Sequence, residues 1–213
     1  MKLIDMTVTN FAKEVDSVSP APGGGSVAAL ASDIGVGLAR MMAHLSFGKK
    51  KYEALDEDIK KEFQSRFEKL GKIRAELSKL VDEDTQSFNE FMNAVKMPKD
   101  TFKQITERQK ILSEATLNSI KVPYKTAYLS LEAMRELEFM VDNGNQNAIT
   151  DIGVGTLMLC TGLEGAILNV KVNLMSLEDK ELAKKYSESC AEMLSEGKDI
   201  RDNILSKIHS AIE

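Results

Sequence analysis

Several residue types are scarce in this 213-residue sequence, and each scarcity excludes a class of protein. The only two cysteines, Cys160 and Cys190, lie too far from each other and from His44 and His209 for a disulfide framework or a zinc site, so we expect reduced thiols and no metal. Lys and Arg number 28 against 33 Asp and Glu, and the net charge of -5 disfavours binding to nucleic acid or an anionic membrane. No run approaches roughly 18 apolar residues and the N-terminus has no apolar signal-peptide core, so we expect a cytoplasmic protein without a membrane span.

Proline is also scarce, and the stretches between prolines predict helices. The four prolines stand at positions 20, 22, 98 and 123, and apolar residues recur between them at intervals of three and four. We therefore expect an all-α, multihelical up-and-down bundle that forms a single domain over residues 1–213. The expected helices cover residues 7–16, 23–47, 56–95, 100–120, 123–141, 147–174 and 177–212.

The longest expected helix is too long for a compact monomer. A helix of about 40 residues extends for about 60 Å, which is about twice the width of a small domain. Part of its apolar stripe therefore needs a partner. We expect a homodimer.

Asp84 interrupts the apolar stripe of this long helix. It occupies the position between Leu80 and Phe88 where the spacing requires an apolar side chain. Burial raises the pKa of a carboxylate toward the range in which it accepts and returns protons near neutral pH, as a general base does. A buried aspartate that hydrogen-bonds a neighbouring helix would give the same pattern. The spacing alone leaves both interpretations open.

Asp151, Asn169 and Asn173 share one face of the sixth expected helix. Eighteen residues make five helical turns, and Asn173 lies one further turn along. The residues between them on this face are small and include Gly155 and Gly162. Such a face is typical of a helix that contacts a flat ligand, and also of a helix that packs closely on another helix.

Ten of the 13 glycines lie in two clusters, at 23–37 and 144–165, which we expect to meet. The segment Pro22-Gly23-Gly24-Gly25-Ser26 leads into a helix, where free backbone N–H groups receive an anion or a polar carbonyl, unless it is only a structural turn. It lacks the residues of a nucleotide phosphate loop. The run Lys49-Lys50-Lys51 is either a solvated link or, beside a site, a receptor for a polyanionic tail.

Taken in order, these segments resemble the cyclodeaminase/cyclohydrolase family of tetrahydrofolate enzymes. Its members include the C-terminal half of formimidoyltransferase-cyclodeaminase and free-standing methenyltetrahydrofolate cyclohydrolases. The resemblance covers nearly the whole chain. It rests on Ser19–Ala29, Phe47–Lys50, Leu80–Phe88, Val122-Pro123, Gly144-Asn145, Asp151 and Asn169–Leu174.

The resemblance implies an all-helical homodimer that binds a folate near a subunit groove, with Asp84 as the general base. Asp33 departs from it, because the family has a small apolar residue there. The implied substrate contacts are Pro22, Gly23, Gly24, Gly25, Ser26, Lys49, Lys50, Asn145, Asp151, Asn169 and Asn173.

Two reactions of this family need the same groups. A cyclodeaminase converts 5-formimidoyltetrahydrofolate to 5,10-methenyltetrahydrofolate and ammonia, whereas a cyclohydrolase converts 5,10-methenyltetrahydrofolate and water to 10-formyltetrahydrofolate. We expect the cyclodeaminase, with the cyclohydrolase as the alternative. The alternative of another class is a non-enzymatic helical dimerisation or folate-binding module.

The expected partners follow from the resemblance. They are a tetrahydrofolate derivative, polyglutamylated or not, a second copy of the chain and a separate formimidoyltransferase. No cofactor beyond the tetrahydrofolate substrate is implied.

Overall fold

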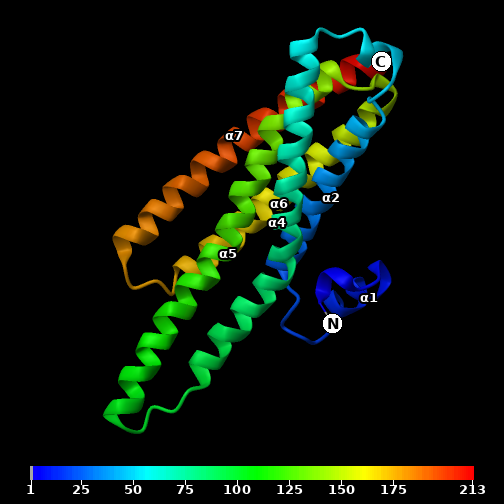
Figure 1. Ribbon diagram of the computed structural model, residues 1–213. Coiled ribbons are helices and arrows are strands. Elements are labelled where there is room, and N and C mark those ends of the chain that lie inside the picture. The colour runs from blue at the N-terminus through cyan, green and yellow to red at the C-terminus, as the bar shows by residue number, and fades with distance from the viewer. Residues whose placement is uncertain (1) are drawn as a thin grey trace.

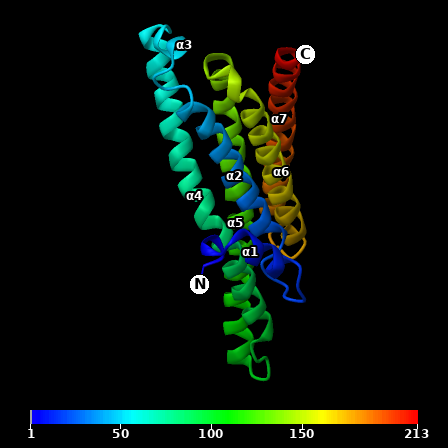
Figure 2. The same cartoon turned by 90° about the vertical axis from the view of Figure 1, so that its right-hand side faces the viewer.

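The computed structural model describes residues 2–213, and within this range every regular element is a helix. The helices run up and down along one long axis, and the α4–α5 hairpin projects past the others at one end (Figures 1 and 2). The expected all-α class is confirmed. The elements are η1 (Leu3–Asp5), α1 (Val8–Val15), α2 (Gly24–His44), α3 (Lys50–Glu53), α4 (Glu57–Lys96), α5 (Phe102–Asn143), η2 (Gln146–Ala148), α6 (Ile149–Leu174) and α7 (Lys180–Ile212).

Local sequence signals set most helix ends. Thr7 caps α1 by accepting the Asn10 N–H at 3.2 Å, and Asp179 caps α7 by accepting the Leu182 N–H at 2.9 Å. The predicted bounds agree with the observed ones to within about three residues at these ends. The link after α2 differs from the prediction, because it contains the short helix α3.

Pro123 lies inside α5, which corrects the predicted break between the helices at 100–120 and 123–141. Proline lacks the N–H that would bond to the carbonyl four residues earlier, which here belongs to Ser119. Asn173 of α6 donates its Nδ2 to this carbonyl at 2.7 Å. Because a side chain of a neighbouring helix satisfies the carbonyl, the helix continues through the proline.

Helices α2 and α6 form the most extensive contact of the bundle, and they touch through glycine. A Cβ atom at Gly35 would lie 2.7 Å from the Gly155 carbonyl oxygen, and one at Gly162 would lie 2.7 Å from the Ala28 carbonyl oxygen. The two glycine clusters therefore meet, as predicted. The bare middle of the α6 face is filled by α2, so close helix packing is the correct interpretation of these small residues.

Two helices are long and apolar enough to cross a membrane by length and composition, namely α2 and the segment Gln146–Leu174. Their apolar windows are 61% and 56% buried inside the bundle. More than half of each apolar window therefore belongs to the core of the bundle.

We expect Gly35→Ala to lower the free energy of unfolding by about 1–3 kcal/mol, because the added methyl group overlaps the backbone of α6. Gly37→Ala is the matched control on the same helix, since its Cβ would meet only the Arg74 Nε, at 3.9 Å. There alanine should be neutral or should stabilise by up to about 1 kcal/mol through helix propensity. Urea unfolding followed by circular dichroism measures both variants, and equal stabilities would contradict the close contact.

Candidate active site

The first turn of α2 lies between Asp84 of α4 and Asn169 of α6. A Cβ atom at Gly25 would overlap the Asp84 carboxylate, and one at Gly24 would lie 3.3 Å from the Asn169 Nδ2. The two glycines therefore let a carboxylate and a carboxamide approach the backbone at a helix start. Any larger residue at position 25 would displace Asp84.

A cavity of about 280 Å³ opens beside this turn. Asp84 is the one ionisable side chain in its lining, and the phenyl rings of Phe88 and Phe91 add aromatic surface. The lining residues are Pro20, Ala21, Gly23, Gly24, Gly25, Asp84, Ser87, Phe88, Phe91, Ser119, Asn169, Val172 and Asn173. The structure thus brings together Gly23, Gly24, Gly25, Asp84, Asn169 and Asn173 of the predicted site.

Burial raises the pKa of Asp84 above the ordinary value of an aspartate. Smaller opposing effects come from the Ser26 hydroxyl, which donates to Asp84 Oδ2 at 3.2 Å, and from the Ser26 backbone. Ser26 Oγ also lies 3.1 Å from the Thr85 hydroxyl. Since Ser26 has one hydroxyl proton and gives it to Asp84, Thr85 donates to Ser26. The carboxylate is held in place without a cation.

The two acidic residues before Asp84 do not line the cavity. Asp82 accepts the backbone N–H groups of Leu3 at 2.6 Å and of Ile4 at 3.4 Å, which attaches the N-terminal segment to α4. Glu83 is exposed to solvent. Asp84 alone of the three both bonds a neighbouring helix and faces the cavity. The hydrogen-bonded interpretation is therefore confirmed, and the role of a general base stays a prediction.

Lys49 and Lys50 lie beyond the opposite end of α2 from the cavity. The helix rises about 30 Å from Gly24 to His44, and both lysines follow that far end and are exposed. Their contact with a substrate stays a prediction, and a single chain does not bring them near Asp84.

Asn145 and Asp151 lie at the same far end. Asn145 donates its Nδ2 to the Leu45 carbonyl at 2.9 Å and its backbone N–H to Ser46 Oγ at 2.8 Å. Asp151 precedes Asn169 by 18 residues, which places it about 27 Å away along α6. Residues that share a face of one helix are therefore divided between the two ends of the bundle.

Three further residues singled out in the sequence lie behind the cavity wall. Pro22 is buried and is not part of the lining, and Ser26 is buried beneath Asp84, so their contacts with a substrate stay predictions. Asp33 is buried between α2 and α4, where it accepts the Ser78 hydroxyl at 2.6 Å and lies 3.4 Å from the Arg74 Nε. Its charge is satisfied away from the cavity.

Sequence reasoning missed Ser119, which lines the cavity from α5. The available signal was Pro123, because a proline inside a helix leaves the carbonyl four residues earlier without its backbone donor. Phe91, also missed as a site residue, was visible only as part of the apolar stripe.

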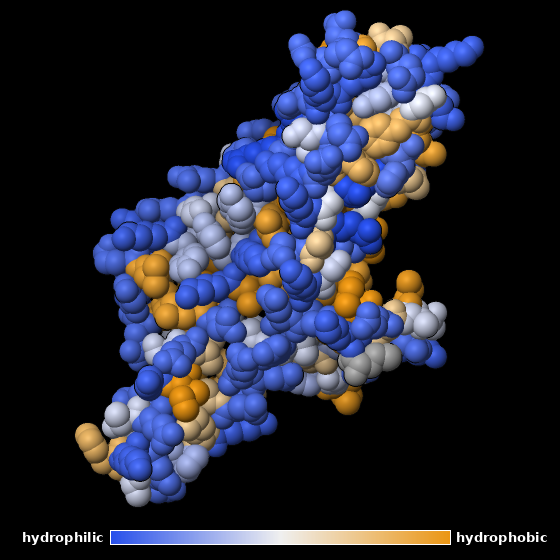
Figure 3. All heavy atoms as spheres, in the orientation of Figure 1, coloured by the Kyte–Doolittle hydropathy of each residue, from blue (hydrophilic) through white to orange (hydrophobic). Residues whose placement is uncertain are grey.

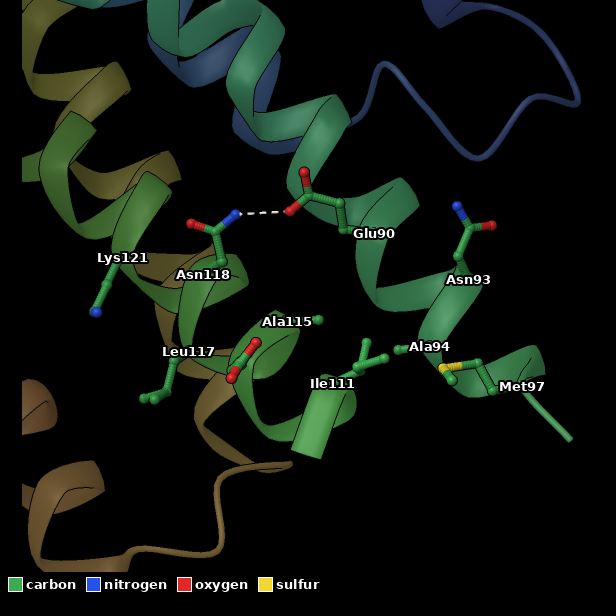
Figure 4. A pocket seen from close by; sticks show the side chains of 10 residues that line it. Glu90, Asn93, Ala94, Met97, Ile111, Ala115, Leu117, Asn118 and Lys121 are labelled. Carbon is green, nitrogen blue, oxygen red and sulfur yellow. Dashed lines mark hydrogen bonds between the residues drawn. The ribbon is translucent and has the colours of Figure 1, made fainter. Parts of the chain in front are cut away.

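Among four larger hollows, the two with the greatest volumes contain none of the predicted site residues. One of about 650 Å³ lies within the α4–α5 hairpin, where Asn118 donates to Glu90 at 3.0 Å (Figure 4). The other, of about 750 Å³, borders the α6–α7 link and shares Phe91 with the cavity. Across residues 2–213 no three His, Cys, Asp or Glu side chains gather as a metal site would require.

The fold and the site together define an all-α protein with a carboxylate-centred cavity at a glycine-rich helix start. The chain belongs to the formiminotransferase-cyclodeaminase family, whose family model matches residues 7–192. The resemblance found in the sequence is thereby confirmed.

Named relatives and a solved structure agree with this assignment. The chain is 30% identical to the methenyltetrahydrofolate cyclohydrolase of Methylorubrum extorquens, over 97% of both chains. It is 31% identical to the formimidoyltransferase-cyclodeaminase of Mus musculus over 92% of its own length, but it spans only 36% of that protein. The crystal structure of formiminotetrahydrofolate cyclodeaminase from Thermotoga maritima has the same fold, with a TM-score of 0.77, 22% identity, and coverage of 99% of this chain and 97% of that one.

We expect Asp84→Asn to fold normally and to be at least as stable as the wild type at neutral pH. The raised pKa means that the native state binds the Asp84 proton more tightly than the unfolded chain does. Wild-type stability from this group therefore falls as pH rises from the ordinary pKa of aspartate through the raised one, and asparagine removes this decrease. Urea unfolding from about pH 4 to pH 8 measures the difference. A marked loss of stability in the asparagine variant at neutral pH would instead show that the charge has a structural role.

Proposed function

We propose that this chain is a 5-formimidoyltetrahydrofolate cyclodeaminase in which Asp84 is the general base. The observation that carries the proposal is the isolation of Asp84. It is the one ionisable side chain lining the cavity, and burial without a nearby cation raises its pKa. A base of this kind exchanges protons closer to neutral pH than an ordinary aspartate, and its negative charge stabilises the positive charge of the methenyl product. The named relatives support tetrahydrofolate as the substrate class.

The reaction requires one proton acceptor that later becomes a donor. Nitrogen N10 of the substrate attacks the formimidoyl carbon, so that a C–N bond forms and closes a five-membered ring. Asp84 accepts the proton that N10 loses and returns it to the departing nitrogen. The formimidoyl group enters protonated, so when the second C–N bond breaks and ammonia leaves, the methenyl bridge keeps the positive charge that the substrate brought. Asp84 ends the cycle ionised, as it began.

The cyclohydrolase reaction is the second candidate, and one comparison favours it. The match to the Methylorubrum extorquens cyclohydrolase covers 97% of both chains. In this reaction Asp84 takes a proton from the water that attacks the methenyl carbon and gives it to N5 as the bond between N5 and that carbon breaks. The hydroxyl of the adduct loses its proton to solvent, and the product is 10-formyltetrahydrofolate. Chain length does not separate the two candidates, because the Thermotoga maritima cyclodeaminase is matched over 97% of its chain as well. A separate formimidoyltransferase would supply the formimidoyl substrate of the first reaction.

We expect Asp84→Asn to lower turnover by at least about 100-fold, because the variant has no base to accept the proton. Glu83→Gln is the matched control, since this exposed neighbour lies outside the cavity lining and should keep wild-type turnover. The assay follows the absorbance of the methenyl chromophore, starting once from 5-formimidoyltetrahydrofolate and once from added 5,10-methenyltetrahydrofolate. Its appearance from 5-formimidoyltetrahydrofolate with ammonia release establishes the cyclodeaminase, and its accelerated loss alone establishes the cyclohydrolase. Binding of folate without either change in absorbance would contradict both enzymatic candidates and would support the folate-binding module.

We also propose that two copies associate through one face of α2 and α6. Ile34 precedes Gly35, and Val154 precedes Gly155, so these two exposed side chains lie on the same side of the antiparallel pair. On this side the exposed apolar residues of α2 recur every seven positions. The exposed apolar residues are Val27, Ile34 and Met41 of α2 and Val154, Leu157, Leu168 and Val172 of α6.

A continuous apolar face of this length is typical of an interface. The opposite side, over α4 and α5, is mostly hydrophilic with separated apolar patches (Figure 3). A two-fold axis perpendicular to the helices would place the Lys49 and Lys50 of one copy beside the cavity of the other. This arrangement would let the lysines contact the glutamate tail of a folate, which a single chain does not allow.

We expect the wild type to have the mass of a dimer in light scattering, and Ile34→Glu to shift it toward the monomer because a charge enters the apolar face. Phe102→Glu is the control, since Phe102 is 86% exposed at the tip of the α4–α5 hairpin. It should leave the mass unchanged. A monomeric wild type, or an unchanged mass for Ile34→Glu, would contradict this interface.

A further inference from the structure

The two serines that line the cavity have already used their hydroxyl protons. Ser87 donates to the Asp84 carbonyl at 2.9 Å, and Ser119 donates to the Thr116 carbonyl at 2.8 Å. A hydroxyl has a single proton, so toward the cavity each serine offers only lone pairs. With the carboxylate of Asp84, the cavity is rich in hydrogen-bond acceptors.

The two carboxamides of the lining are oriented in the same sense. Asn169 donates its Nδ2 to the Gly165 carbonyl at 2.9 Å, and Asn173 donates its Nδ2 to the Ser119 carbonyl at 2.7 Å. Since a carbonyl oxygen only accepts, these bonds fix which end of each amide is nitrogen. Within residues 2–213 neither Oδ1 atom has a hydrogen-bond donor, and both side chains line the cavity.

Pro123 leaves unoccupied the carbonyl to which Asn173 donates. At any other residue type, the N–H of position 123 would bond to the Ser119 carbonyl and complete the helical ladder. Proline has no N–H and leaves that carbonyl to the side chain of α6. A residue of α5 that does not line the cavity thus sets the polarity of a residue that does.

We propose that Pro123 and Ser119 position Asn173 so that its Oδ1, together with that of Asn169, accepts hydrogen bonds from the donor edge of a reduced pterin ring. This inference rests on the proposed function and specifies which hydrogen bonds recognise the substrate in the same cavity. The pyrimidine edge of a pterin carries an exocyclic amino group beside a ring N–H, and these donors match the acceptors of two residues one helical turn apart on α6. A phosphate or carboxylate does not match them, because acceptors would face acceptors.

The first experiment tests the orientation of Asn173 by a double-mutant cycle in thermal unfolding. Asn173→Ala should lower the Tm by roughly 3–6 °C, because the Ser119 carbonyl loses the donor that Asn173 supplies. In a Pro123→Ala background the same change should lower the Tm by less than about a third of that amount, since the new N–H at position 123 bonds to the carbonyl. Asn169→Ala is the matched control. It bonds within its own helix and should cost the same in both backgrounds.

Equal losses for Asn173→Ala with and without Pro123 would overturn the positioning role. The cycle uses no folate, so its result is independent of the proposed function.

The second experiment tests the recognition role by calorimetric titration with tetrahydrofolate and with its 2-desamino-2-methyl analogue. The wild type should bind tetrahydrofolate at least about tenfold more tightly than the analogue, because the analogue lacks the exocyclic donor. The double variant Pro123→Ala/Asn173→Ala, although stable, should bind tetrahydrofolate about tenfold more weakly than the wild type and should lose most of this preference.

Three outcomes would overturn the recognition role. Wild-type affinity in the stable double variant would show that Asn173 only completes α5. Equal affinity of the wild type for the two ligands would show that the protein does not recognise the exocyclic amino group. Absence of tetrahydrofolate binding would remove the substrate class as well, whereas tight and selective binding without turnover would count against the proposed function alone.

Discussion

The close approach of α2 to its neighbours is the constraint on which the rest of the structure depends. Gly35 and Gly155 bring the backbones of α2 and α6 into contact in the middle of the bundle, and Gly25 lets Asp84 of α4 reach the first turn of α2. The small residues at this helix start leave room for a half-buried carboxylate beside the cavity. The packing of small residues and the chemistry of the cavity therefore have one cause.

The position of Asp84 sets two electrostatic effects against each other. The N-terminus of α2 and the donors of Ser26 favour the ionised carboxylate, whereas burial favours the protonated one. Burial is the larger effect, and the pKa rises. The same hydrogen bonds that keep the carboxylate in place also keep its pKa from rising further. The Ser26 donors at this helix start thus serve the protein's own carboxylate, and contact of the glycine-rich turn with a ligand stays a prediction.

The sequence predicted the helical class, the long α4 and the exceptional position of Asp84, because each depends on periodicity along one helix. It failed at Pro123, since the donor that keeps α5 continuous comes from Asn173, a residue 50 positions later on another helix. It also grouped Asp151 with Asn169, because helical spacing shows which residues share a face and not which share a location. Both failures concern where residues lie relative to other helices, which the spacing of residues along one helix does not predict.

The link between Pro123 and Asn173 has a consequence for how this fold tolerates change. Alanine at position 123 would restore a backbone hydrogen bond and remove a residue that is costly in a helix interior. Considered as folding alone, such a replacement is favourable. It would also release the carboxamide of Asn173 from the Ser119 carbonyl, and with it the orientation that we propose for ligand binding. The missing N–H of Pro123 in α5 and the Asn173 carboxamide on α6 are in this way linked through one hydrogen bond. Under our proposal, the proline is retained because that hydrogen bond orients a residue of the cavity.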